Sequence, residues 1–244
     1  MADRAEEAGF DIAAEMPDES RLVTEDDAPL DSVYQEKQQR LLTGPLHDSW
    51  PGPPDGEGGH RPFVAMANVG LFHLEEPAIV PDMLLGLDVE LPPDPAPKKA
   101  RSYFLWRYGK PPEVVVEFVS NREGGELDRK KDIYERMRVV WYVVFDPLAC
   151  LGDVALRCFE HRAGEYVERL DARFDKLGLA LVEWAGRFED MDARWLRWAT
   201  LDGQLVPTGR ERAERERERA ERERERAERL AARLRELGVD PEEV

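Results

Sequence analysis

The sequence has very few cysteines and no long apolar run. Its 244 residues include two cysteines, Cys150 and Cys158, which match no metal-binding spacing. No segment approaches the roughly 20 apolar residues that a membrane-spanning helix needs, and the N-terminal sequence MADRAEEAGF lacks the apolar stretch of a secretory signal. We therefore expect a reduced, cytoplasmic protein that does not enter a membrane.

Basic residues are also in deficit, because the net charge is −17. The deficit is uneven: residues 1–31 carry −9, residues 32–209 carry −7 and residues 210–244 carry −1. Proteins that bind nucleic acid tightly without sequence preference are usually basic, so the average charge argues against that class. A local basic patch or a bound metal ion can offset this average.

Three segments of the chain differ in composition. Residues 1–31 are acidic and poor in aromatic residues, which is typical of a disordered tail. Residues 32–209 hold nearly all the aromatic residues and predict one folded domain. Residues 210–244 begin with the sequence RERAERE, which repeats every seven residues.

The C-terminal repeat favours a single solvated helix over residues 210–237, with Gly238 as its C-cap. Each repeat supplies one apolar residue, whereas a coiled coil normally has two. Glu and Arg residues at i,i+4 spacing stabilise a lone helix. Weak dimerisation is the alternative, through the apolar stripe formed by Ala213, Ala220, Ala227 and Leu234.

The domain sequence alternates strand-like and helix-like segments. Apolar runs predict strands at residues 63–71, 78–85, 113–120 and 140–145, followed by hairpins around residues 156–170 and 181–205. Helices are expected to begin near residue 32, with Asp31 as N-cap, and to cover residues 100–108 and 127–139. This order predicts a mixed α/β fold with a central β-sheet flanked by helices.

Two carboxylates interrupt the apolar strands. Glu117 lies in the middle of the run VVVEFVS, and strand alternation places it on the same face as Val115 and Val119. Asp82 interrupts the run IVPDMLL in the same way. A buried carboxylate is costly unless it is paired or binds metal, and two of them on neighbouring strands could bind a hard cation through oxygen.

A lysine accompanies the carboxylates. On a helical wheel of residues 127–139, Lys130 falls at the centre of the inward apolar face, whereas Lys131 lies towards the flank. An inward lysine beside two carboxylates indicates a functional site. Lys130 could stabilise developing charge on a phosphate or orient the attacking water, while Mg²⁺ on Asp82 and Glu117 polarises the phosphate.

The run EVVVEFVSNREGGELDRKKDIYERMRVVWYVVFDP, with VPDM upstream, resembles the Uma-two family of restriction endonucleases, a branch of the PD-(D/E)XK nuclease superfamily. The resemblance spans residues 32–209. It implies a restriction-endonuclease-like core with a mixed sheet and flanking helices. It also implies an endonuclease that hydrolyses DNA phosphodiester bonds with Mg²⁺ or Mn²⁺.

The resemblance assigns roles to individual residues. Asp82 matches the acid of the first motif and Glu117 the acid of the second. The superfamily usually places a lysine two residues after the second acid, where this chain has Val119. The family instead supplies a lysine from the following helix, four residues before a tyrosine, and Tyr134 makes that residue Lys130.

Two further positions follow from the resemblance. An acid on the first helix often completes such sites, and Glu36 is the nearest candidate. Arg138 stands where the family usually has a glycine at the end of the lysine-bearing helix. This departure concerns the local turn and not the carboxylates.

A basic segment with aromatic residues lies between the two acidic motifs. Residues 98–110, KKARSYFLWRYGK, contain five bases and no acid. Bases for phosphates and rings for stacking suit nucleic acid, but an amphipathic helix with its rings inward explains the pattern equally well. The candidate phosphate-binding residues are Lys98, Lys99, Arg101, Arg107, Lys110, Arg122 and Arg129.

Each proposed site residue also has a structural reading. Asp82 could be a turn or cap residue, Glu117 could form a buried ion pair with an arginine, and Lys130 could extend to solvent. At the level of function, the alternatives are a nucleic-acid-binding module without catalysis and an interaction protein that works through its charged helix. Nucleases that cut both strands are often dimers, so a homodimer is a further expectation of the nuclease reading.

Overall fold

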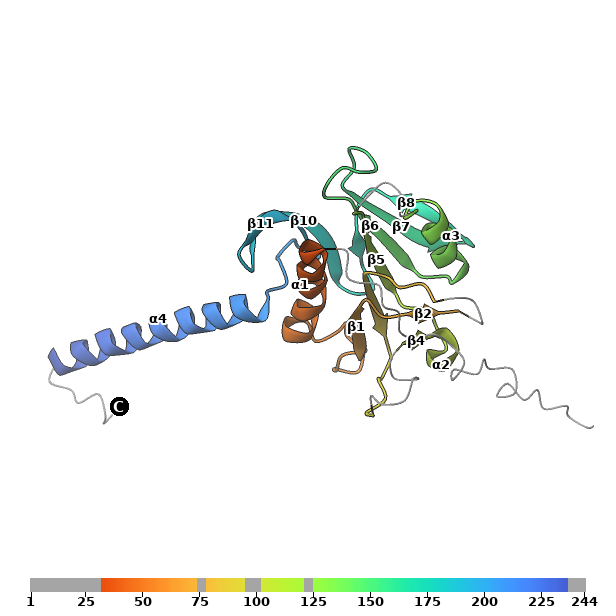
Figure 1. The fold of residues 1–244 in the computed structure, drawn as a ribbon. Helices are drawn as coiled ribbons and strands as arrows, with labels where there is room; N and C mark the ends of the chain where they lie inside the picture. Colours follow the sequence, from red (N-terminus) through yellow and green to blue (C-terminus); the bar gives the residue numbers. More distant parts are fainter. Residues whose placement is uncertain (1–31, 74–77, 95–101, 121–124, 237–244) are drawn as a thin grey trace, which may run out of the picture.

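The computed structural model describes residues 32–73, 78–94, 102–120 and 125–236 (Figure 1). The acidic segment 1–31 and the two expected caps, Asp31 and Gly238, lie outside these residues. The first helix, α1 (Val33–Ser49), is instead capped by Ser32, whose hydroxyl accepts a hydrogen bond from the Gln35 backbone N–H.

A six-stranded sheet in the order β1-β3-β5-β6-β7-β8 forms the centre of the domain. The strands β5 and β6 pair in parallel and the other neighbours pair antiparallel, so the sheet is mixed as expected. These strands are β1 (Phe63–Ala67), β3 (Met83–Leu87), β5 (Val114–Phe118), β6 (Trp141–Phe145), β7 (Leu156–Arg162) and β8 (Glu165–Arg169).

The remaining elements surround this sheet. Two short strands pair in parallel, and a three-stranded sheet contains the long hairpin β10–β11. These strands are β2 (Leu71–Phe72), β4 (Tyr103–Phe104), β9 (Arg173–Phe174), β10 (Leu179–Phe188) and β11 (Met191–Thr200). The other helices are α2 (Leu105–Tyr108), α3 (Arg129–Arg136) and α4 (Gly209–Glu236). The predicted mixed α/β fold with a long C-terminal helix is confirmed.

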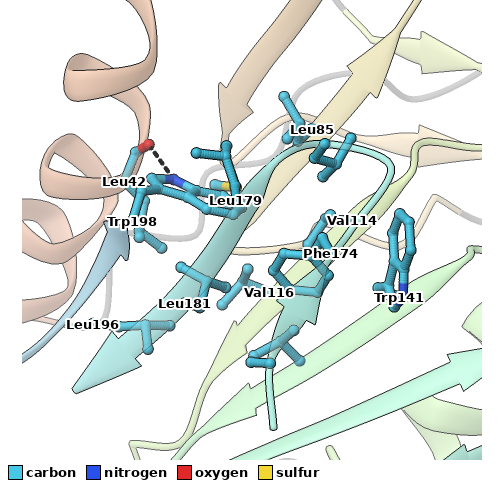
Figure 2. Packing of buried hydrophobic residues seen from close by; sticks show 14 of the residues in the cluster. Leu42, Leu85, Val114, Val116, Trp141, Phe174, Leu179, Leu181, Leu196 and Trp198 are labelled. Carbon is cyan, nitrogen blue, oxygen red and sulfur yellow. Dashed lines mark hydrogen bonds between the residues drawn. The ribbon is translucent and has the colours of Figure 1, made fainter. Parts of the chain in front are cut away.

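The two faces of the central sheet have separate cores. The first core packs α1 and the β10–β11 hairpin against Val114, Val116 and Phe118 of β5, and Trp198 donates a hydrogen bond of 2.9 Å to the Leu42 carbonyl (Figure 2). The second core lies on the opposite face. It packs Tyr134 of α3 against β5 and β6. The whole of β5 is buried, which explains its continuous apolar run.

Several predicted boundaries were wrong. The expected strand at residues 63–71 is divided by Asn68, whose φ of 52° ends β1. The expected helix at residues 100–108 is helical only over α2, because Tyr103 and Phe104 form β4 and are fully buried. Aromatic residues are common in strands, so the alternation of rings and bases misled the helix prediction.

The turn after α3 has a left-handed residue at the position where the resemblance implies a glycine. Arg138 has a φ of 60°, its N–H donates to the Glu135 carbonyl, and the next N–H, of Val139, donates to the Tyr134 carbonyl. This pair of hydrogen bonds is a Schellman motif, in which glycine is the favoured residue. The chain therefore forms the left-handed turn that usually contains glycine, although Arg138 occupies the position.

The long helix α4 projects from the domain and is exposed along nearly its whole length (Figure 1). Its first turn is attached to the domain by Arg197, which is 2% exposed and donates two hydrogen bonds of 2.9 and 2.7 Å to the Glu211 carboxylate. Glu211 also accepts from the Thr208 N–H and donates its own N–H to the Thr208 hydroxyl, forming a capping box. Across the described ranges, no helix is both long enough and apolar enough to cross a membrane.

Candidate active site

Asp82 lies at a bend immediately before β3, close to the end of β5. One carboxylate oxygen accepts the Phe118 N–H at 2.7 Å, and the other accepts the Gln39 amide at 3.1 Å. The antiparallel register pairs Met83 with Val116, so its next step places Asp82 opposite Glu117. Residues opposite each other in a ladder share one face of the sheet, and this register explains how the two carboxylates meet.

Glu117 is 1% exposed and lies on the face of β5 that packs against α3. One carboxylate oxygen accepts from the Lys130 ammonium at 2.9 Å, and the other accepts from the Tyr134 hydroxyl at 2.6 Å. Burial raises the pKa of Glu117 to about 8, although Lys130 opposes this shift, and nearby Asp82 adds to it. Burial also raises the pKa of Asp82.

Lys130 is the second residue of α3 and reaches the sheet through its side chain, which is 29% exposed. Its ammonium lies 2.9 Å from Glu117 and 3.4 Å from Glu126. Burial disfavours the charged ammonium, but the nearby acids Glu117, Glu126 and Asp82 together raise the pKa of Lys130. The inward orientation read from the helical wheel is therefore present in the structure.

The cluster has the donor set of a site for a hard divalent cation. Asp82 and Glu117 lie opposite each other in the β3–β5 register, and burial disfavours the charge on both. A bound cation would offset that cost. Within the described segments, no group of three or more His, Cys, Asp or Glu side chains is placed to hold an ion. Mg²⁺ suits two carboxylates, because it keeps several of its waters and takes substrate oxygens.

Two buried polar residues in the site were missed by the sequence analysis. Glu126 is 4% exposed and pairs with Lys130, four residues later. Gln39 is buried on α1 and exchanges amide hydrogen bonds with Asn68 while donating to Asp82. The i,i+4 spacing from Lys130 was a usable signal for Glu126. For Gln39, the only signal in the sequence was its position on the buried face of α1.

Glu36, the candidate acid on the first helix, is placed elsewhere. Its carboxylate pairs with Arg40 at 2.7 Å, and Arg40 also pairs with Glu189. The residue of α1 that contacts Asp82 is Gln39, almost one turn further along. The assignment of Glu36 is therefore corrected: the helix contributes an amide at this point, not an acid.

The candidate phosphate-binding residues have different environments. Lys110 donates to the Glu113 carboxylate and, at 2.9 Å, to the Leu87 carbonyl, so its charge is already engaged. Arg107 and Arg129 are exposed on α2 and α3. The remaining candidates lie outside the described residues: Lys98, Lys99, Arg101 and Arg122. The rings of Tyr103 and Phe104 are buried in the fold and cannot stack on bases.

Comparison with known proteins identifies the family. No curated protein sequence matches the chain. A family model does match residues 28–180, which is more than half of the chain and includes the described cluster. The description of that family is "Putative restriction endonuclease". This chain belongs to the Uma2 family.

Proposed function

We propose that this protein is an endonuclease that hydrolyses DNA phosphodiester bonds with Mg²⁺ or Mn²⁺, held by Asp82 and Glu117. The main support is the meeting of Asp82, Glu117 and Lys130, from three separate segments, in one largely buried cluster. Burying this many charges together destabilises a fold, so their presence favours a catalytic role over a structural one. Membership of a family described as restriction endonucleases supports DNA as the substrate.

Each residue has a distinct task in this proposal. The divalent cation, when bound, would polarise the phosphate and lower the pKa of an attacking water. Asp82 is oriented by the Phe118 N–H, and Glu117 is oriented by the Tyr134 hydroxyl. Lys130 supplies a positive charge for the oxygens of the phosphate, where negative charge develops. Arg129 immediately precedes Lys130 in α3, is exposed and would contact the DNA backbone.

Two wider features belong to the same proposal. A homodimer would present two sites to the two strands of a duplex. We also propose a cytoplasmic location, because a cellular DNA substrate would be met there. Neither feature is needed for the chemistry of a single cut.

The test is cleavage of supercoiled plasmid with Mg²⁺ or Mn²⁺ by the wild type, Glu117→Gln and Lys130→Met. The wild type should nick or linearise the plasmid, and each variant should be slower by about 10²-fold or more, because Glu117→Gln loses a metal-binding carboxylate and Lys130→Met loses the positive charge beside the phosphate. Lys131→Met is the matched control, because the ammonium of Lys131 instead lies over the Phe159 ring. It should cut like the wild type.

A wild type that leaves plasmid intact with both ions would contradict the proposal. Variants that cut as fast as the wild type would contradict it as well. If the intact chain bound plasmid in a gel-shift assay without cutting it, the function would be that of a nucleic-acid-binding module on a nuclease fold.

A further inference from the structure

Glu126 is a buried acid beside the site whose charge is only partly compensated. One carboxylate oxygen lies 3.4 Å from the Lys130 ammonium, and the other is buried without a hydrogen-bond partner among the described residues. An unsatisfied buried carboxylate oxygen costs free energy. The backbone of Glu126 is held separately, because the Tyr142 hydroxyl donates to the Glu126 carbonyl at 2.8 Å.

The backbone around Glu126 fixes it relative to Lys130. Gly125 has a φ of 67°, which favours glycine, and its carbonyl accepts from the N–H groups of Asp128 and Lys130. This turn begins α3 and sets the two side chains on the same side, four residues apart. The pairing is therefore built into the start of the helix.

The charges in the cluster do not balance. Asp82, Glu117 and Glu126 are acids, and Lys130 is the base that contacts two of them. A lysine ammonium has three N–H donors, so it can serve both glutamates at once. Any cation that binds Glu117 competes with Lys130 for the same carboxylate. Glu126 would then be the remaining partner of the ammonium.

We propose that Glu126 is a positioning residue: it holds the Lys130 ammonium beside the phosphate when a divalent cation engages Glu117. This inference rests on the proposed function. Glu126 is not assigned as a ligand, because among the described residues no three acids are placed to hold one ion. Lys130 contacts two glutamates, Glu117 and Glu126. Without the Glu126 carboxylate, Lys130 would keep the contact with Glu117 and would compete more strongly with the cation for the Glu117 carboxylate.

The test is a double-mutant cycle read out by Mn²⁺ affinity, measured calorimetrically on the full chain. Glu126→Gln should weaken Mn²⁺ binding by about tenfold when Lys130 is present, because the lysine then occupies Glu117. In the Lys130→Met background the same substitution should weaken binding by no more than about threefold. Gln has the shape of Glu, and the Tyr142 hydrogen bond uses the backbone, so thermal unfolding should show folded variants.

Two results of the cycle would overturn the inference. An equal loss of Mn²⁺ affinity in both backgrounds would mean that Glu126 acts on the ion directly. No loss in either background would mean that Glu126 does not influence how Lys130 and the cation share Glu117. Neither result depends on the protein being an active nuclease.

Cleavage kinetics give a second readout. Glu126→Gln should lower kcat by about tenfold or more with little change in KM, because a misplaced lysine weakens the transition state, and Glu126→Asp should recover part of the rate. Asp132→Asn removes an exposed acid of α3 and is the control with unchanged rate. An unchanged kcat in Glu126→Gln would overturn the role. If the wild type does not cut, the proposed function fails, and the affinity cycle still decides whether Glu126 positions Lys130.

Discussion

The two faces of strand β5 are built from different chemistry. One face presents Val114, Val116 and Phe118 to an apolar core closed by α1 and the β10–β11 hairpin. The other presents Val115, Glu117 and Val119 to α3, and Glu117 is as deeply buried as its neighbours. One strand therefore contributes to stability on one side and carries a costly charge on the other. The difference supports the catalytic role that we propose for the second face.

The largest expected effect is a loss of stability when the apolar face of β5 is disrupted. Trp198→Ala removes a fully buried ring and its hydrogen bond to the Leu42 carbonyl, so the free energy of unfolding should fall by about 3–5 kcal/mol. Denaturant unfolding followed by fluorescence would measure this loss. Below the unfolding transition, the rate of plasmid cleavage should stay near that of the wild type, because the ring does not touch the charged cluster. A selective loss of cleavage in fully folded protein would contradict the separation of the two faces.

The second effect tests the charged face through pH. In the metal-free folded protein the pKa of Glu117 is raised to about 8 by burial, against an ordinary value of 4.5. The folded state therefore holds this proton more tightly than the unfolded state, and stability is lost as pH rises between these two values. Glu117→Gln avoids that loss. It should become more stable than the wild type by a few kcal/mol above pH 8, and the gap should shrink towards pH 5.

Thermal unfolding of both proteins across this pH range is the measurement. Glu165→Gln, an exposed acid at the start of β8, is the control whose curve should run parallel to that of the wild type. If Asp82 and Glu117 hold the ion as proposed, added Mg²⁺ should stabilise the wild type more than Glu117→Gln. Parallel curves for Glu117→Gln and the wild type would show that Glu117 is not destabilised by burial.

The smallest effect concerns the turn that ends α3. Arg138 holds a left-handed conformation that costs a residue with a side chain roughly 1–2 kcal/mol. Arg138→Gly should remove this strain and raise stability by about 1 kcal/mol or less, because glycine also gains freedom in the unfolded chain. The rate of cleavage should not change, because Arg138 follows the C-terminal end of α3, whereas Lys130 lies near its N-terminal end. A loss of stability would mean that the arginine side chain makes a compensating contact.

Much of the charged face was predictable from the sequence. Glu117 stands out because a carboxylate interrupts an unbroken apolar strand, and Lys130 stands out because it occupies an inward position of a short amphipathic helix. Both signals come from a few neighbouring residues, so they can be read from the sequence without knowing how the elements pack. Glu126 and Gln39 were missed because a single polar residue in a turn or helix is normally solvated. Their burial depends on which elements cover them.

The sequence by itself determined the mixed α/β class, the long charged helix and the apolar strand that carries Glu117. These follow from periodicity and composition, which act over a few residues. The tertiary structure decided which acids meet. Asp82 reaches Glu117 through the register of β3 and β5, and Gln39, not Glu36, completes its hydrogen bonds from α1. Contacts between residues so far apart in the chain depend on strand pairing and helix packing, which local patterns do not specify.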